Sequence, residues 1–318
     1  MENTQEYIEK RALFDEYYHK EIFPRMQELE NKRKKYFNCF MFASIFTLSW
    51  SIALFCGVLD KFIEMLEAKG VNVELLSCLL VLFICLPMVG FKRQAKESLL
   101  PLISNFFGNF EYKYKSGIDE SVVADSKIIS YYDYLEFDDG FVGFYEGVNV
   151  SIDEYIAYKE IQVTRNNETK YELKKDKRGI IFCATMNKKF KGQTVVSKDR
   201  GILNKITKYK KLERVTLEAP VFEKYYEVYS DNQIEARYIL TPVMLKYMEE
   251  LKLYFSKIEF SFFDDIVFVN ILTKRNMFEC NSFFTSIINK KRIYKNFNEL
   301  YLLFSIIHTM HLNEERLL

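Results

Sequence analysis

Two stretches without a charged side chain dominate the N-terminal third of this chain. The first, residues 38–59, runs for 22 residues, and the second, residues 75–91, runs for 17. A helix needs about 20 apolar residues to cross a bilayer core about 30 Å thick. The first run therefore predicts a membrane-spanning helix, and the second reaches the minimum length when Val71 and Val73 extend it. Joined by a short polar link, the two runs predict a transmembrane helical hairpin.

The flanking charges predict one orientation for this hairpin. Seven basic residues lie next to its outer ends: Lys32, Arg33, Lys34, Lys35, Lys92, Arg93 and Lys96. The link, residues 60–74, carries four acidic residues and only two lysines. Because basic residues near membrane ends stay on the cytoplasmic side, both chain termini are expected in the cytoplasm. The alternative is a buried helical hairpin in a large soluble core, although such helices normally carry ionisable groups where one face meets water.

Charge and cysteine usage argue against several classes of function. The chain has 45 Lys and Arg against 44 Asp and Glu, so it lacks the basic character that is typical of nucleic-acid-binding proteins. Four of the six cysteines fall in the apolar runs, which leaves Cys183 and Cys280 in the rest of the chain. No C-x-x-C spacing occurs, and no histidine is close to a cysteine in sequence. We therefore expect no metal site, no cofactor and no nucleic-acid partner.

The apolar runs divide the chain into three regions. Residues 1–37 predict a charged helix with a break near Pro24, residues 38–91 form the hairpin, and residues 92–318 predict a cytoplasmic domain. Apolar residues recur at three- and four-residue steps along the charged helix: Tyr7, Ile8, Leu13, Phe14, Tyr17 and Tyr18. A helix of this kind packs on the C-terminal domain or pairs with a second copy of the chain.

The third region predicts an α+β domain with a mostly antiparallel sheet. It begins with an amphipathic segment, residues 94–112, interrupted by Pro101, and a linker at 116–125. Short strands are predicted at 141–145, 148–152, 171–173, 180–184, 194–196, 212–217, 225–229, 257–262 and 266–272. Helices are predicted at 230–237, after Thr241-Pro242, and at 298–311. Strands grouped with helices, without strict βαβ alternation, indicate the α+β class.

Turn residues separate the predicted strands. Glu146-Gly147 predicts a hairpin turn, and Asn166-Asn167 predicts another. The acidic pairs Asp138-Asp139 and Asp264-Asp265 are also assigned to turns, because Asp is a favoured turn residue. The alternative for both pairs is a metal or acid–base site. The chain contains none of the glycine-rich phosphate-binding motifs and no hydrolase motif.

Two motifs in this region carry a family resemblance. They read GIIFCATMNKKFKGQTVV at residues 179–196 and FEKYYEVYSDNQIEARYILTP at residues 222–242. Both resemble the bacterial family catalogued as domain of unknown function 3137, over about residues 30–280. The resemblance implies two membrane helices followed by a cytoplasmic domain in a bacterial inner membrane. It implies no activity, because the family has no established catalytic or binding residues.

The second motif contains the candidate recognition surface, formed by Tyr226, Asp231, Glu235 and Arg237. These polar groups crowd into a short helix between a strand and the Thr241-Pro242 helix start. The alternative is purely structural: Ser230 and Gln233 form a capping box, Asp231 favours the helix N-terminus, and Arg237 pairs with a carboxylate.

These observations predict a hairpin-anchored cytoplasmic domain used for interaction or scaffolding. Its expected partners are the lipid bilayer and a protein, or a second copy of the chain, and no catalytic residue is assigned. The alternative is a membrane-tethered enzyme that acts on a lipid or a nucleotide-like substrate through Asp231, Glu235 or Arg237. A channel subunit is a third reading, but two helices per chain enclose a pore only in an oligomer.

Overall fold

The computed structural model describes residues 5–57, 61, 64–65, 68–70, 73–115, 117–165, 168–186, 189–198, 209, 211–255, 257–278 and 283–310. Within helix α4 the side chains of residues 73–85 and 87 lie outside this description. The chain divides into two compact units. The helical unit comprises Ile8–Leu102 and Glu279–Ile293, and the sheet unit comprises Met1–Tyr7, Ile103–Phe278 and Tyr294–Leu318.

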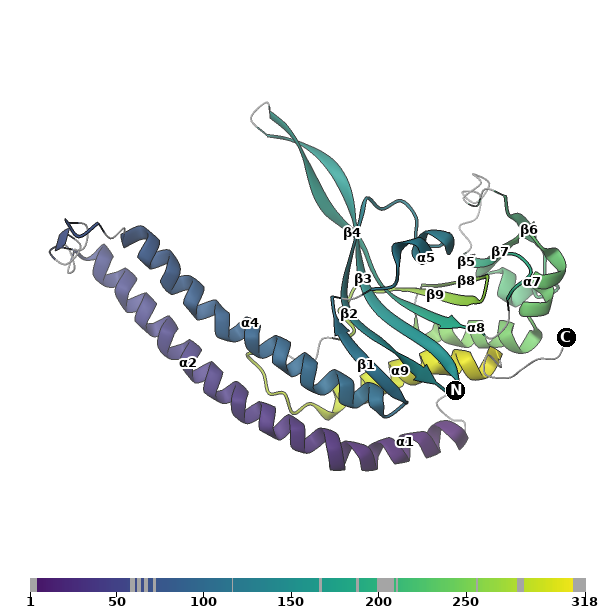
Figure 1. The fold of residues 1–318 in the computed structure, drawn as a ribbon, viewed down its shortest axis with the longest axis horizontal. Helices are drawn as coiled ribbons and strands as arrows, with labels where there is room; N and C mark the ends of the chain where they lie inside the picture. Colours follow the sequence, from purple (N-terminus) through teal and green to yellow (C-terminus); the bar gives the residue numbers. More distant parts are fainter. Residues whose placement is uncertain are drawn as a thin grey trace. The chain divides into compact units, whose positions relative to one another are not determined.

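The helical unit is built from long helices (Figure 1). Helix α1, Gln5–Tyr17, continues through a π-helical turn at Tyr18–Ile22 into α2, Phe23–Phe55, and α4 spans Val73–Asn105. The predicted break near Pro24 is this π turn. Pro24 has no N–H to donate and its ring crowds the preceding turn, so the backbone widens there instead of ending the helix.

One stripe of the first helix is buried at four- and three-residue steps. It consists of Phe14, Tyr18, Ile22, Met26 and Leu29. The change of step from four to three follows the π turn, which rotates the apolar stripe back onto one side of the helix. Of the apolar positions that the sequence singles out, Ile8 and Leu13 remain exposed.

A buried ion pair joins α2 to the segment 283–287 of the same unit. Arg33 donates from Nη2 to Glu30 Oε1 at 2.8 Å and from Nη1 to the backbone oxygen of Phe283 at 3.0 Å. The other oxygen of Glu30 accepts from the backbone N–H of Ile287 at 2.9 Å. The Phe283 ring is fully buried among the rings of Phe37, Phe40 and Phe91. Arg33, predicted only as a flanking charge of the hairpin, thus also holds this segment in place.

The first predicted span is a continuous helix with an exposed apolar surface. Among the described residues, one helical stretch, Gln5–Phe55, is long and apolar enough to cross a membrane, and none of its most apolar 18 residues is buried. Large apolar side chains such as Phe42 and Phe55 lie on its surface. The second predicted span falls within α4, but most of its side chains lie outside the described residues. The two-helix transmembrane hairpin therefore stays a prediction.

The sheet unit contains a nine-stranded antiparallel sheet, which confirms the predicted α+β class. Its spatial order is β1-β2-β3-β4-β9-β8-β5-β7-β6. The strands are β1 Asn109–Tyr114, β2 Tyr134–Tyr145, β3 Val148–Arg165, β4 Glu168–Thr185, β5 Thr194–Lys198, β6 Glu213–Val215, β7 Tyr226–Ser230, β8 Ile258–Phe263 and β9 Ile266–Leu272. The helices are α5 Glu120–Asp125, α6 Pro220–Glu223, α7 Gln233–Ile239, α8 Pro242–Tyr254 and α9 Lys290–Met310, which begins in the helical unit.

Several predicted boundaries are confirmed. β2 and β3 meet at Glu146-Gly147, where both residues have positive φ (50° and 83°), as a two-residue hairpin turn requires. Asp264-Asp265 connects β8 to β9. Helix α8 starts at Pro242, with the Thr241 side chain accepting a hydrogen bond from the Met244 N–H at 3.3 Å. The predicted turn at Asn166-Asn167 lies outside the described residues.

Other boundaries predicted from the sequence are wrong. Pro101 does not interrupt the helix, because α4 runs through it to Asn105, and the linker at 116–125 contains α5. The strands predicted separately at 171–173 and 180–184 are one strand, β4, paired with β3 along its whole length. Figure 1 shows the far ends of these two strands as an arm that extends beyond the rest of the sheet. Most side chains of β4 before residue 177 face water, so the sequence there lacks the apolar alternation that signals a strand.

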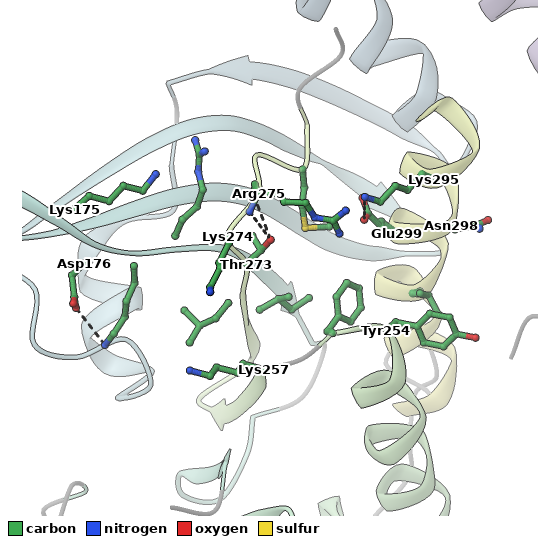
Figure 2. A pocket seen from close by; sticks show the side chains of 17 residues that line it. Lys175, Asp176, Tyr254, Lys257, Thr273, Lys274, Arg275, Lys295, Asn298 and Glu299 are labelled. Atoms are coloured by element: carbon green, nitrogen blue, oxygen red, sulfur yellow. Dashed lines mark hydrogen bonds and ion pairs between the residues drawn. The ribbon is translucent and has the colours of Figure 1, made fainter. Parts of the chain in front are cut away.

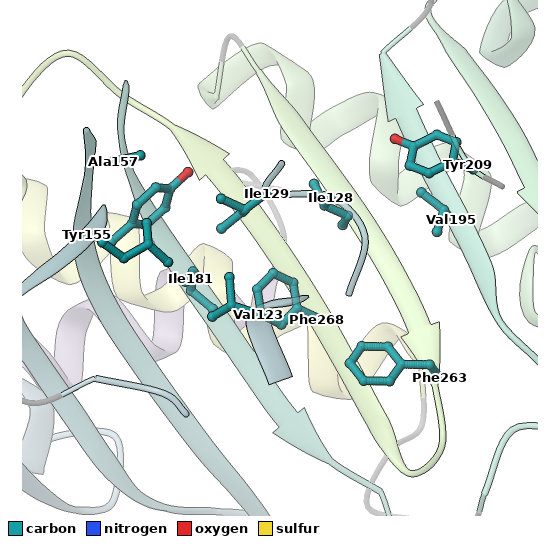
Figure 3. Packing of buried hydrophobic residues seen from close by; sticks show 11 residues of the cluster. Val123, Ile128, Ile129, Tyr155, Ala157, Ile181, Val195, Tyr209, Phe263 and Phe268 are labelled. Atoms are coloured by element: carbon teal, nitrogen blue, oxygen red, sulfur yellow. The ribbon is translucent and has the colours of Figure 1, made fainter. Parts of the chain in front are cut away.

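Buried side chains pack on both faces of the sheet. On one face, α5 and the segment after it pack on β3, β4 and β9 (Figure 3), through a cluster that includes Val123, Ile128, Ile129, Tyr155, Ile181 and Phe268. On the other, the Phe304 ring of α9 lies 5.1 Å from that of Phe110 in β1 and 4.5 Å from that of Tyr145 in β2. All six residues of β8 are buried, as expected for a strand covered on both sides.

Candidate recognition surface

The two motifs that carry the family resemblance lie side by side in the sheet. β5 of the first motif pairs with β7 of the second, from Thr194 opposite Ser230 to Lys198 opposite Tyr226. Just before β5, the backbone N–H of Gln193 donates to Asp231 Oδ1 at 2.7 Å. Gly192 makes this approach feasible, since a Cβ there would lie 2.3 Å from the same oxygen, and its φ is +130°. Asp231, in the second motif, therefore holds the end of the loop that precedes β5 in the first motif.

Helix α7 begins two residues later than the sequence predicts. Its N-cap is Asn232, whose side-chain oxygen accepts from the Glu235 N–H at 3.1 Å. Ser230, the predicted cap, is instead the last residue of β7, and its hydroxyl lies 3.0 Å from that of Thr194. The capping box is wrong because strand pairing holds Ser230, while Asn232 is an equally good cap.

Arg237 and Glu235 lie at the surface of α7. Arg237 donates from Nη1 to the backbone and side-chain oxygens of Gln233, at 2.8 and 3.0 Å, and from Nη2 to the backbone oxygen of Thr216 at 3.2 Å. Its described partners are neutral oxygens, so the pairing with a carboxylate that the structural alternative requires does not occur among the described residues. Glu235 accepts from the Lys191 N–H at 3.4 Å, a long contact that leaves its carboxylate near the surface.

Two apolar residues missed by the sequence analysis share the face of Arg237. Ile234 is 83% exposed and Tyr238 is also exposed. Ile234 is three residues before Arg237 and four before Tyr238, so it lies between these two side chains on the helix surface. Exposed apolar and aromatic groups around an arginine are typical of protein interfaces. The helical spacing of Ile234 and Tyr238 was visible in the sequence and would have added them to the surface.

Tyr226 is not part of this exposed face. It is 3% exposed, and its ring stacks on that of Phe222 at a centroid distance of 4.9 Å. Burial raises the pKa of its hydroxyl group, and the carboxylates of Glu249 and Glu259 add to the shift. The structure thus brings Asp231, Glu235 and Arg237 together around α7 and leaves Tyr226 in the core beneath. Recognition by these residues stays a prediction.

A second polar group of residues lies inside the sheet unit. Asp138-Asp139, predicted as a turn, sits within β2 at a β-bulge between Phe137 and Gly140. The bulge places their carboxylates within 4.8 Å of that of Glu154. A bulge changes the facing of consecutive side chains, which is why alternation alone did not reveal the cluster.

Arg178 supplies the positive charge for these carboxylates. Its Nε lies 3.1 Å from Glu154 Oε1, and its Nη2 lies 3.5 Å from Asp138 Oδ2. The Tyr112 hydroxyl donates to Asp139, and Asn276 donates to Asp138 at 3.3 Å. A guanidinium this close supplies positive charge beside the carboxylates, so the arrangement is that of a largely buried ion-pair network.

The fold and the two adjoining motifs define an α+β domain linked to long helices, and the comparisons with known proteins agree at family level. Residues 177–312 match the family described as "Protein of unknown function (DUF3137)". The resemblance stated from the motifs is confirmed over this segment of the chain. The match starts later and ends later than the range of about 30–280 expected from the motifs. No curated protein matches the chain.

One solved structure is similar in part. It is the crystal structure of the mycobacterial trehalose monomycolate transport factor A, TtfA, with 9% sequence identity, 68% of this chain and 94% of that chain covered, and a TM-score of 0.38. A score of this size carries no argument about the fold or the function of this chain.

Proposed function

We propose that this chain is a bacterial inner-membrane protein in which a helical hairpin, residues 38–59 and 75–91, anchors a cytoplasmic interaction domain. The observation that carries the anchor is the exposed apolar surface of α2. A soluble protein rarely leaves so many large apolar side chains in water, whereas lipid covers them without cost. Both termini lie in the cytoplasm in this proposal, since the basic residues flank the hairpin on that side.

The interaction part of the proposal rests on α7. Ile234, Arg237 and Tyr238 share an exposed face, flanked by Asp231 and Glu235. Arg237 has no carboxylate partner among the described residues, so its charge is available to an acidic group on a second protein. We propose a protein partner that places apolar side chains on Ile234 and Tyr238 and a carboxylate opposite Arg237.

The catalytic alternative receives less support. Three cavities formed by described residues, of about 970, 510 and 220 Å³, are lined by none of Asp231, Glu235 and Arg237. An enzyme needs such groups to converge on a concave site. A capped helix with exposed apolar side chains suits docking better.

Photo-crosslinking in native membranes tests the interaction directly. A photoreactive residue replaces Tyr238 in the full chain, and a second chain carries it at the exposed Tyr171 of β4 as the matched control. We expect recurrent attachment of one protein at position 238, reduced several-fold by Arg237→Gln, and a different or absent pattern at position 171. Attachment to a second copy would make the chain its own partner. Equal patterns at both positions, or none at 238, would contradict the proposal.

A further inference from the structure

One cavity formed by described residues lies in the sheet unit and is strongly basic. Its volume is about 970 Å³, within the range of small-molecule sites. Its lining contains seven basic residues, Lys175, Lys177, Arg178, Lys257, Lys274, Arg275 and Lys295, and two acidic ones, Asp176 and Glu299. The whole chain has nearly equal numbers of each sign, so this excess is local.

The acidic residues of the lining are already engaged. Asp176 lies 3.2 Å from Lys159 Nζ and 3.8 Å from Lys177 Nζ, and Glu299 lies 3.7 Å from Lys295 Nζ. Burial raises the pKa of the Glu299 carboxyl, against the opposing effect of Lys295 and Arg275, so its negative charge is disfavoured. Neither acid compensates the remaining lysines.

Three lysines of the lining have no carboxylate partner within ion-pair distance among the described residues. They are Lys175 on β4, Lys257 just before β8 and Lys274 just after β9. Figure 2 shows the amino groups of Lys257 and Lys274 on the same side of the backbone that carries Thr273. Lys257 also lines two smaller hollows, of about 510 and 220 Å³, to which Lys198 contributes as well. Like charges gathered in a concave site repel one another and concentrate anions.

The floor of the cavity is apolar. Phe255, Ile271, Met277 and Leu302 are buried there, and Tyr254 and Asn298 stand at the edge with α8 and α9. A ligand that fits this lining combines an apolar or aromatic part with a multiply charged anionic group. Phosphate esters have this chemistry, and lysine amino groups bind phosphate as point charges.

We propose that this cavity binds a phosphate ester, with Lys257 and Lys274 contacting the phosphate and Phe255, Ile271 and Leu302 contacting the apolar part. The ester comes from a free phosphorylated molecule or from a phospholipid headgroup. The site is distinct from the surface around α7, since none of Asp231, Glu235 and Arg237 lines the cavity.

The test uses the full chain in nanodiscs and one charge-matched control. The variant Lys257→Gln/Lys274→Gln removes two cavity lysines, and Lys189→Gln/Lys246→Gln removes two exposed lysines that line none of the three cavities. In discs of phosphatidylcholine, ADP and pyrophosphate are titrated by calorimetry at two salt concentrations. In discs containing phosphatidylglycerol, the thermal midpoint and the lipid retained after purification are measured.

If the ligand is a free molecule, ADP or pyrophosphate binds and its affinity falls as the salt concentration rises. The affinity is also at least about tenfold lower in the cavity variant but unchanged in the control. A lipid ligand predicts a midpoint raised by phosphatidylglycerol and retained lipid, both lost only in the cavity variant. Binding of neither source, or equal binding by both variants, would overturn the proposal. Binding of a polyglutamate peptide in place of both phosphate sources would overturn it as well. Crosslinking at position 238 is expected to be unchanged in the cavity variant, which separates this site from the proposed partner surface.

Discussion

Asp153 of β3 lies opposite Gly140 of β2 and Ile181 of β4, and its side chain is 1% exposed. Burial raises the pKa of its carboxyl to about 6, although the Ser151 hydroxyl donates to it and Lys113 lies near. The folded state therefore holds a proton on Asp153 at a pH where the unfolded chain has released it. At this scale a single buried carboxyl makes stability depend on pH.

Replacing Asp153 by Asn removes that dependence. The wild-type contribution is fully present below the ordinary Asp pKa of 3.8 and is lost as pH rises through about 6. We expect Asp153→Asn to be about 2–3 kcal/mol more stable than wild type at pH 8 and equal to it near pH 3.5. Thermal unfolding of the detergent-solubilised chain across this range measures the difference. Glu172→Gln, on the exposed part of β4, is the control, and a parallel gain there would refute the assignment.

Gly192 decides how the two family motifs meet. In Gly192→Ala the new Cβ collides with the Asp231 carboxylate and the backbone stays at a φ that L-residues avoid. The expected cost is about 1–3 kcal/mol of unfolding free energy, with loss of the Gln193–Asp231 hydrogen bond. Gly147→Ala has a positive φ but open space around it, so it isolates the backbone part of the cost. An equal loss of stability in both variants, measured by chemical unfolding, would mean that the Asp231 contact is unimportant.

At the scale of elements, the sequence predicts well the apolar strands that turns bound, such as β8 and β9, and a helix with one buried face, such as α8. The turns at Glu146-Gly147 and Thr241-Pro242 were predictable because local backbone chemistry fixes them. The arm of β3 and β4 and the bulge at Asp138-Asp139 were not, because exposed strands lack alternation and a bulge breaks it. The N-cap of α7 is Asn232 and not the predicted Ser230, because Ser230 pairs with Thr194 of β5. Pairing between strands that are distant in sequence is not visible in the local pattern.

The ion pair of Glu30 and Arg33 holds the segment 283–287 on α2. The hydrogen bond from Arg33 keeps the pKa of Glu30 below its ordinary value, against the effect of burial, so its stabilisation is present above about pH 4.5 and is lost as pH falls through the lowered pKa. Glu30→Gln leaves the Arg33 guanidinium buried without its counter-charge. We expect a loss of about 2–4 kcal/mol.

Hydrogen exchange of the Ile287 amide, which donates to Glu30, measures this effect locally. Exchange at Ile287 is expected to accelerate in Glu30→Gln at pH 7. Glu28→Gln is the matched control, because Glu28 pairs with Arg25 and Lys32 in an exposed position and should leave Ile287 protected. Unchanged protection in Glu30→Gln would show that the ring cluster around Phe283 alone holds the segment.

At the scale of the whole molecule, the balance of charge conceals where the charges lie. Seven basic residues line one cavity although the chain carries a net charge of only +1. They lie on β4, just before β8, just after β9 and on α9, so only the tertiary fold brings them together. The candidate surface on α7 was partly predictable, since Asp231, Glu235 and Arg237 were named from the second motif, although Ile234 and Tyr238 of the same motif were not. The cavity was not.

We propose that α2 belongs to a membrane hairpin that keeps the sheet unit in the cytoplasm. The most direct measurement is labelling of single cysteines in intact spheroplasts with a membrane-impermeant maleimide, after the six native cysteines are replaced. Ala68→Cys reports on the link and Lys189→Cys on the sheet unit, and alkaline extraction of the same membranes reports on anchoring. We expect a chain that resists extraction, with labelling at position 68 in intact spheroplasts and at position 189 only after lysis. A chain released by alkali, or one labelled at position 189 but not at 68 before lysis, would contradict it.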